Sequence, residues 1–168
     1  WYLAVNYNAE DITNGSVVYA NDTDPVTGEF FIALAKADSI APSGATLGLA
    51  TATIPGTDSE PDPSKRIGLV TNFGAVRDFD TSHLLTTKAM WLSATVAGSL
   101  TSTKPSVGSQ LILMGACQAS DNVSGRVWVE VNRTTNSVPS YKSESFSSRG
   151  VSAGTYYLFG NYLAPSAD

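Results

Sequence analysis

The only histidine of the chain, His83, is the only imidazole available to act as a general base. Its neighbours Asp78, Asp80 and Ser82 are of the residue types that complete a hydrolytic triad. Adjacent side chains of an extended backbone point to opposite faces, so Ser82 cannot easily reach His83. The pattern therefore favours a histidine in a surface loop, and we predict no catalytic residue.

Three acids, Asp58, Glu60 and Asp62, alternate in a proline-rich loop and superficially resemble the start of a calcium loop. An EF-hand counted from Asp58 needs glycine at position six and a bidentate glutamate at position twelve. Pro63 and Leu69 stand there instead. A looser calcium site stays open, because oxygen-rich loops bind hard cations without a fixed template. A solvated loop is favoured, and we predict no metal.

Other cofactor chemistry finds little support. With one cysteine, Cys117, and one histidine, the chain can form neither an internal disulfide nor a Cys/His zinc cluster. Gly44, Gly48 and Gly56 match neither the Walker nor the dinucleotide spacing. The acids cluster in turns, as they do on a solvated surface, and sequence cannot measure the carboxyl separation that a glycosidase needs. We predict no cofactor and no enzymatic activity.

Aromatic residues form the one unusual local feature. Four of them lie close together near the end of the chain: Tyr156, Tyr157, Phe159 and Tyr162. On strands such residues more often serve packing than sugar binding, and here they are predicted to contact another subunit. Trp91 and Trp128 are candidates for stacking on a glycan.

Composition limits the fold and the partners. The chain has 168 residues and a mass of 17.6 kDa, which fits one domain, or one domain with an appended segment. Charged residues are 15%, against an average of about 25%, and much of the polarity comes from Ser and Thr, which favours an all-β protein. A net charge of −5 disfavours nucleic-acid binding. No apolar run approaches the roughly 20 residues of a membrane helix, so no membrane insertion is expected.

Short runs between glycines and prolines predict strands, and their spacing predicts a small antiparallel barrel or sandwich with a C-terminal β extension. The expected strands are 1–6, 16–20, 29–36, 46–54, 66–73, 75–79, 89–95, 110–117, 126–131, 141–147 and 155–162.

Local signals refine this outline. Asn14-Gly15 and the segment 25–28 have the chemistry of hairpin turns, so the first 36 residues are expected to form a meander. Both faces of 29–36 are apolar, which predicts burial on each side. The stretch 80–91 lacks a sustained helical stripe, and at most one helical turn is expected there.

A change of composition near 134–140 predicts two parts, a β module over 1–133 and a Ser/Tyr-rich β extension over 134–168. The extension is expected to continue into, or contact, another part of the assembly. The opening Trp1 and the aromatic ending predict a processed chain or a piece of a longer one.

Three runs, Asn14–Tyr19, Gly68–Ser82 and Met90–Pro105, occur in the order of a module that recurs in tailed-bacteriophage virion proteins. The third run is the most specific, because turn chemistry alone does not dictate so many side chains in order. The chain resembles this module over roughly residues 10–132, and capsid decoration proteins are more loosely similar. It departs from the pattern at Thr86-Thr87-Lys88, where the module would have a turn that contains glycine.

The resemblance implies a non-catalytic structural protein of the virion that builds or anchors a fibre, spike or surface decoration. Its implied partners are copies of itself, with a trimer favoured, and other virion proteins, with a host-surface glycan as a further candidate. Two alternatives stay open. One is a carbohydrate-binding module; the other is a fragment of a tail-associated depolymerase, which would need paired acids in a groove.

Overall fold

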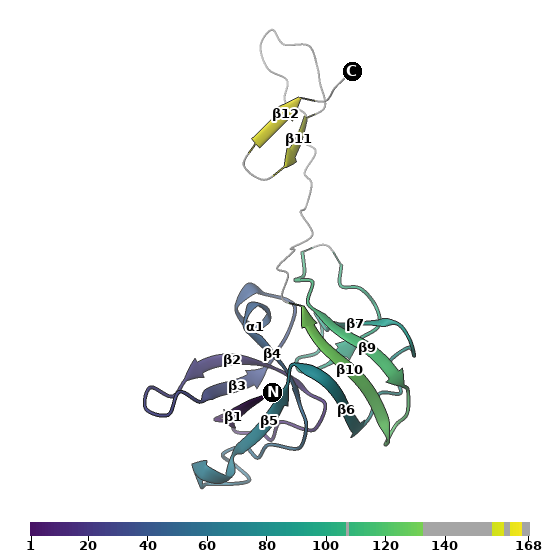
Figure 1. Ribbon diagram of the computed structural model, residues 1–168. Helices are drawn as coiled ribbons and strands as arrows, with labels where there is room; N and C mark the ends of the chain where they lie inside the picture. The colour runs from purple at the N-terminus through teal and green to yellow at the C-terminus, as the bar shows by residue number, and fades with distance from the viewer. Residues whose placement is uncertain (107, 133–155, 160–161, 166–168) are drawn as a thin grey trace. The chain divides into compact units, whose positions relative to one another are not determined.

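A computed structural model describes residues 1–106, 108–132, 156–159 and 162–165 of the chain (Figure 1). It is nearly all β, with 44% strand and 5% helix, which confirms the predicted fold class. The chain divides into two compact units, residues 1–138 and 139–168. No helix in the described ranges is long and apolar enough to cross a membrane.

Five strands close into a barrel in the order β1-β3-β2-β4-β5. They are β1 (Tyr2–Asn6), β2 (Val17–Thr23), β3 (Phe30–Leu34), β4 (Thr46–Ala50) and β5 (Ile67–Thr71). All neighbours in the barrel are antiparallel except β1 and β3, which run parallel. Closure leaves the barrel without free strand edges.

A second, antiparallel sheet has the order β6-β10-β9-β7-β8. Its strands are β6 (Phe73–Phe79), β7 (Ala89–Leu92), β8 (Leu100–Thr101), β9 (Leu113–Ala119) and β10 (Gly125–Asn132). Two short helices lie in connections, α1 (Ile40–Gly44) and the 3-10 turn η1 (Pro63–Lys65). The sequence signals predicted neither α1 nor the two-residue β8.

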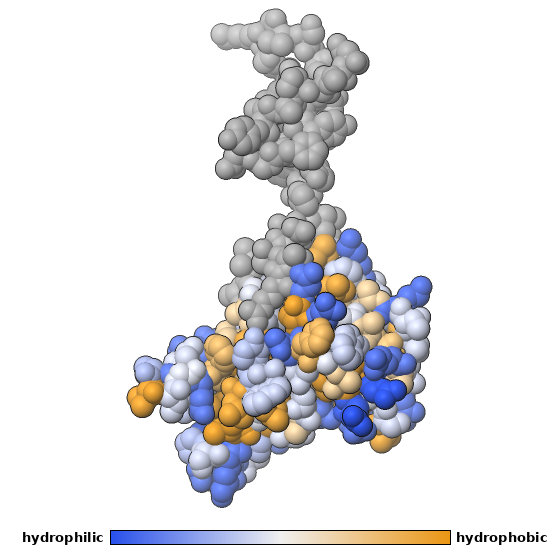
Figure 2. Space-filling model, viewed as in Figure 1, coloured by the Kyte–Doolittle hydropathy of each residue, from blue (hydrophilic) through white to orange (hydrophobic). Residues whose placement is uncertain are grey.

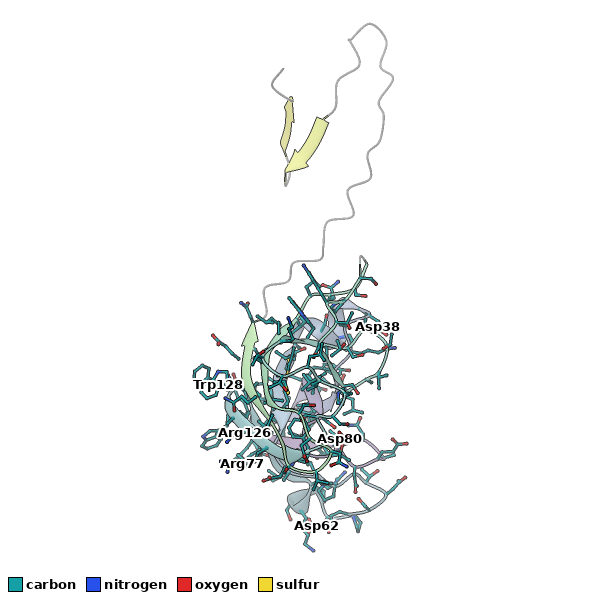
Figure 3. All side chains as sticks on the ribbon, turned by 90° about the vertical axis from the view of Figure 1, so that its right-hand side faces the viewer. Asp38, Asp62, Arg77, Asp80, Arg126 and Trp128 are labelled. Carbon is teal, nitrogen blue, oxygen red and sulfur yellow. The ribbon has the colours of Figure 1, made fainter. Side chains whose placement is uncertain are left out.

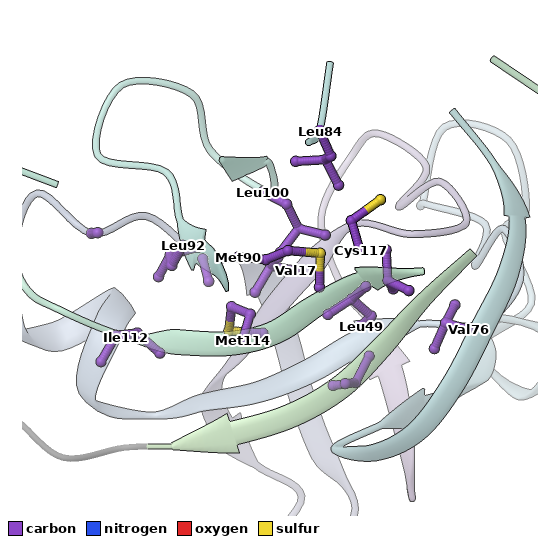
Figure 4. Packing of buried hydrophobic residues seen from close by; sticks show 14 residues of the cluster. Val17, Leu49, Val76, Leu84, Met90, Leu92, Leu100, Ile112, Met114 and Cys117 are labelled. Atoms are coloured by element: carbon purple, nitrogen blue, oxygen red, sulfur yellow. The ribbon is translucent and has the colours of Figure 1, made fainter. Parts of the chain in front are cut away.

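Two hydrophobic cores meet at β4, where all five residues are buried. Leu47 and Ala50 belong to the core inside the barrel, together with Val18 and Val70. Leu49 belongs to a second core between barrel and sheet (Figure 4). The full set of buried residues in this second core is Val17, Ala35, Ala37, Leu49, Val76, Leu84, Met90, Leu92, Leu100, Ile112, Met114, Cys117, Val127 and Val129.

The predicted N-terminal meander is wrong. The strand β3 pairs with β1 on one side and β2 on the other, so β1 and β2 are not neighbours. The physical reason lies in β2, which places Val17 in the second core and Val18 inside the barrel. The strand β2 therefore lies beside β4, on the side of the barrel that faces the second sheet. The predicted turn at 25–28 does connect antiparallel β2 and β3 as a hairpin.

The predicted Asn14-Gly15 hairpin is also wrong, since this turn contacts β6 instead. The Asn14 Nδ2 donates to the carbonyl oxygens of Arg77 (3.1 Å) and Asp78 (2.9 Å). Gly15 has φ of +83°, and a Cβ atom there would come within 2.2 Å of the Phe79 ring. Glycine is therefore required for the close approach of this turn to the second sheet.

Burial on both faces is predicted for 29–36, but neither face of β3 is buried along its whole length. Ile32 is buried in the barrel core, and Phe30 packs against that core. Leu34 lies on the same face as Ile32, pairs with Val18, and is 37% exposed. On the opposite face Phe31 is half-buried against the Tyr7 ring, with the ring centroids 4.3 Å apart. The stretch 80–91 forms turns followed by the start of β7 and contains no helix, in keeping with its missing apolar stripe.

Thr87 occupies the position where the module pattern has a glycine-containing turn, and its φ is +63°. A β-branched residue in the left-handed region is destabilised by roughly 1–2 kcal/mol, and glycine avoids this strain. Glycine also raises the conformational entropy of the unfolded chain, which offsets part of the gain in stability. We expect Thr87→Gly to raise the free energy of unfolding by about 0.5–1 kcal/mol, measured by urea titration. The neighbouring Thr86→Gly has no such strain to relieve and should destabilise the chain; equal effects of both changes would contradict this explanation.

The C-terminal unit contains an antiparallel pair, β11 (Tyr156–Phe159) and β12 (Tyr162–Pro165). The single strand predicted over 155–162 is thus wrong, because Phe159 in β11 pairs with Tyr162 in β12 and the two belong to different strands. The predicted strand 141–147 and the boundary at 133/134 lie outside the described residues. So do the side chains of the four aromatic residues predicted to contact another subunit.

Candidate functional site

The residues around His83 do not form a triad. The Ser82 hydroxyl donates to the Asp80 carboxylate (2.7 Å), which also accepts the Ser82 amide (2.9 Å). His83 is exposed and makes no hydrogen bond to any residue that the structure describes. Ser82 and Asp80 therefore form a local turn in which the serine hydroxyl is engaged with the acid and not with the imidazole.

His83 and Asp80 do line a cavity of about 190 Å³ beside the Asn14-Gly15 turn. Its other lining residues are Thr13, Ser16, Phe79, Gly98, Ser99 and Leu100. Ser82 is not among them, and the hydroxyl groups that line the cavity belong to Thr13, Ser16 and Ser99. Thr13 and Ser16 bond to each other (3.0 Å), and among the described residues no hydroxyl group is hydrogen-bonded to His83. This arrangement gives no support to covalent hydrolysis.

The acids of the loops serve as hydrogen-bond acceptors for their own turns. Asp62 accepts the amide (3.0 Å) and hydroxyl (2.8 Å) of Ser64, at the start of η1. Asp11 accepts the Ser59 hydroxyl and the Gly56 amide, the latter at 2.8 Å, and joins the acidic loop to the barrel. Within the described ranges no three Asp, Glu, His or Cys side chains gather in a way that could hold a metal ion.

These bonds shift the titration of six aspartates. The hydroxyl of Ser59 and the amide of Gly56 lower the pKa of Asp11, and the amides of Ser124 and Val123 lower the pKa of Asp121. In Asp24, Asp38, Asp62 and Asp80 the pKa is also lowered, by the amide of Val26 and by the side chains of Lys36, Ser64 and Ser82 respectively. All six are carboxylates that folding favours in the charged form.

The lowered pKa values predict an acid-labile fold. A carboxyl whose pKa is lower in the folded state stabilises the chain above its unfolded pKa, near 3.8, and this contribution is lost as the pH falls through the folded pKa. We expect the free energy of unfolding to fall from about pH 4 downward. Asp121→Ala should be less stable at pH 7 and should lose less than the wild type on acidification. Urea titrations across the pH range measure the free energy of unfolding, and Asp58→Ala serves as the exposed control. Parallel curves of unfolding free energy against pH for Asp121→Ala and the wild type would contradict this prediction.

Cys117 lies in the second core at 1% exposure, and burial raises the pKa of its thiol. A protonated, enclosed thiol is a poor nucleophile, so Cys117 acts as a small apolar packing residue.

A buried polar network, which the sequence signals did not reveal, fixes one end of the barrel. Asn6 is fully buried, and its Nδ2 donates to the carbonyl oxygens of Glu10 (2.9 Å) and Ile54 (3.1 Å). Its Oδ1 accepts the amide (2.9 Å) and the side-chain Nδ2 (2.8 Å) of Asn8. Every polar atom of this amide side chain is thereby bonded, and the loop that follows β1 is tied to the barrel.

Beside this network, Arg66 is 4% exposed and stacks on the Tyr7 ring, with the guanidinium carbon 4.8 Å from the ring centroid. Tyr7 in turn packs on Phe31. A cation over an aromatic face is attracted by the ring quadrupole, so this stack holds the end of β1 against the start of β5.

The outer face of β1 and β5 carries exposed apolar side chains, which we call the β1–β5 patch: Trp1, Leu3, Tyr7, Ile67 and Leu69. Leu3 pairs directly with Leu69 across the two strands, and they are 48% and 43% exposed. Trp1 is 75% exposed. Figure 2 shows hydrophobic side chains gathered over β1 and β5 on this face. The patch depends on a pairing between distant segments, so the local sequence pattern did not show it.

The two tryptophans named as glycan-stacking candidates differ in exposure. Trp91 on β7 is half-buried, and the Lys104 Nζ lies 5.9 Å from its ring centroid. Trp128 on β10 is 37% exposed and meets the Phe73 ring edge-on, with centroids 5.3 Å apart. Trp128 projects from the outer face of the second sheet (Figure 3).

Comparison of the chain with protein-family models, with curated proteins and with solved structures finds no match. Function therefore has to be argued from the residues and their geometry.

Proposed function

We propose that the chain is a non-catalytic structural protein of a tailed-bacteriophage virion, which builds or anchors a fibre, spike or surface decoration. The resemblance of residues 10–132 to a module of phage virion proteins supports the assignment to a phage particle. The engaged side chains of Ser82 and Asp80 and the burial of Cys117 support a role other than catalysis. Such a protein acts by binding copies of itself and other virion proteins.

The observation that carries the assembly role is the β1–β5 patch. Exposed apolar side chains that lie next to one another on a folded chain are candidates for an interaction site. In this patch the Leu3–Leu69 pair lies on a regular two-strand surface between Trp1 and Tyr7, which suits flat packing against another protein. We infer that a second copy of the chain covers it, with closed trimeric symmetry favoured. The C-terminal residues Tyr156, Tyr157, Phe159 and Tyr162 stay a proposal for a further contact.

Immuno-electron microscopy tests the particle assignment. Antibodies raised against residues 1–132 should label phage particles from the source at a fibre, spike or head-surface position. Pre-immune serum is the control. Particles whose purified proteins lack this chain, by labelling and by peptide mass spectrometry, would contradict the proposal.

A second role, contact with a host-surface glycan, is favoured by one observation. Trp128 is 37% exposed on the outer face of the second sheet, and its ring is braced by the Phe73 ring, with centroids 5.3 Å apart. An aromatic face held in a fixed orientation is a stacking platform for a sugar ring.

A further inference from the structure

The outer face of β6 and β10 places two arginines opposite each other. Paired positions across these strands are Arg77 with Arg126, and Ala75 with Trp128. Val76, between Ala75 and Arg77, and Val127, between Arg126 and Trp128, are buried in the second core. Because strand side chains alternate between faces, the arginines and Trp128 share the outer face, and Figure 3 shows all three on one side.

Neither arginine forms an ion pair with an acid in the described part of the chain. Among the described residues the ion pairs are Lys36–Asp38 and Lys65–Asp62, and both arginines are exposed. Like charges directly opposite each other across two strands are destabilising. Acids near the face are Asp78, which follows Arg77, and Glu130, which pairs with Phe73 on the far side of Trp128. In a chain of net charge −5 this unpaired cationic pair favours an anionic ligand.

The backbone around the arginine pair is fixed from the barrel side. Asp78 has φ of +65°, and the Asn14 Nδ2 holds the carbonyl oxygens of Arg77 and Asp78 at 3.1 and 2.9 Å. A register shift at Gly125/Arg126 marks a bulge in the facing strand. Bulges and strained residues re-aim side chains, and they cluster near binding sites.

Trp128 has small neighbours on both sides of its strand. It pairs with Ala75 on β6 and Ala116 on β9, so no bulky side chain stands beside the ring at either paired position. Arg126 lies two residues away on the same face of β10, about 7 Å along the strand. One sugar ring on the indole can therefore carry a carboxylate to the guanidinium groups, which bind carboxylates with two parallel hydrogen bonds.

We propose that Arg77, Arg126 and Trp128 form a binding site for a carboxylate-bearing glycan, such as a polymer that contains uronic acid. This inference rests on the glycan-contact part of the proposed function and names its chemical class. The two arginines bind the carboxylate and the indole stacks on the sugar ring.

Isothermal titration calorimetry of the full chain with a galacturonic acid trimer tests the site. The methyl ester of the same trimer removes the charge and keeps the ring. We expect binding of the acid with Kd of about 1 mM or tighter, and binding at least about tenfold weaker for the ester. Arg77→Gln and Arg126→Gln should each weaken binding of the acid about tenfold, and Trp128→Ala should weaken binding of acid and ester alike. The control is Lys104→Gln, which removes an exposed cation from a loop that follows a strand of the same sheet. This change should leave the affinity for the acid unchanged.

Each other outcome overturns the inference. Equal binding of acid and ester would leave glycan contact standing and remove the role of charge. Equal binding of hexaglutamate would point to an acidic protein partner instead. Absence of binding at 10-fold above the expected Kd of about 1 mM, with circular dichroism unchanged, would remove the glycan site without affecting the particle assignment.

Discussion

Asn6→Leu is expected to destabilise the chain by about 2 kcal/mol. Leucine fits a buried position of this size but forms none of the four hydrogen bonds made by the Asn6 side chain. The carbonyl oxygens of Glu10 and Ile54 would lose the Nδ2 donor, and Asn8 would lose the Oδ1 acceptor for its amide and side chain. The Ile54 carbonyl oxygen keeps the Ile12 amide as a donor, and Asn8 is exposed to water. The loss therefore falls mainly on the partly buried Glu10 carbonyl oxygen and Asn8 amide. A buried polar group left without a partner costs about 1–3 kcal/mol, part of which the added apolar burial offsets.

Urea unfolding followed by tryptophan fluorescence measures this loss. The matched control is Asn21→Leu, because Asn21 is exposed and its side chain accepts only the Tyr19 hydroxyl, at 3.2 Å. We expect the control to stay within about 0.5 kcal/mol of the wild type. A loss below 1 kcal/mol for Asn6→Leu would show that the network does not hold the barrel end.

The double change Leu3→Thr with Leu69→Thr is expected to weaken self-association about 100-fold. Each side chain is close to half exposed in the free chain, so its burial in an interface is worth about 1–1.5 kcal/mol, and the pair lies at the centre of the β1–β5 patch. Threonine keeps the strand preference of the position, so the barrel itself should remain folded.

Analytical ultracentrifugation across a concentration series gives the dissociation constant. The control is Leu85→Thr, which makes the same substitution at a leucine that is 60% exposed and lies outside the patch. Tyr157→Ser with Tyr162→Ser tests the C-terminal contact separately. If Leu85→Thr weakens association as much as the patch variant, the patch is not the interface.

Strand positions in this chain follow from local sequence, whereas strand partners do not. The hairpin at 25–28 joins two strands that do pair, and its loop is closed by the Asp24 amide donating to the Glu29 carbonyl oxygen (2.8 Å). Asn14-Gly15 has equally good turn chemistry, yet it packs on Phe79 of the other sheet. A turn signal specifies backbone dihedrals, and the choice of partner is made by burial of distant residues such as Val17 and Leu49.

Thr87 concerns local backbone conformation and not the choice of strand partners. The module pattern indicated a glycine-containing turn at 86–88, and the left-handed φ of Thr87 is the conformation that glycine favours. The residues Thr86-Thr87-Lys88 did not themselves indicate this conformation, because a β-branched residue rarely adopts a left-handed φ.

The candidate surfaces were harder to predict than the strands. Trp128 was identified as an exposed aromatic candidate, but Arg77 and Arg126 were not connected with it, because only the β6–β10 register places them side by side. Leu3 and Leu69 were likewise separate until the β1–β5 register paired them. In both cases the functional unit is a cross-strand neighbourhood, which periodicity along one strand does not contain.

The most direct test of the assembly role is the molar mass of the wild-type chain by sedimentation equilibrium. If a second copy covers the β1–β5 patch, as proposed, the sample contains a species heavier than 17.6 kDa whose mass falls toward the monomer on dilution. The resemblance to a phage module implies that this species is a trimer. A mass of 17.6 kDa at every concentration, in a sample that is folded by circular dichroism, would contradict self-assembly through this face.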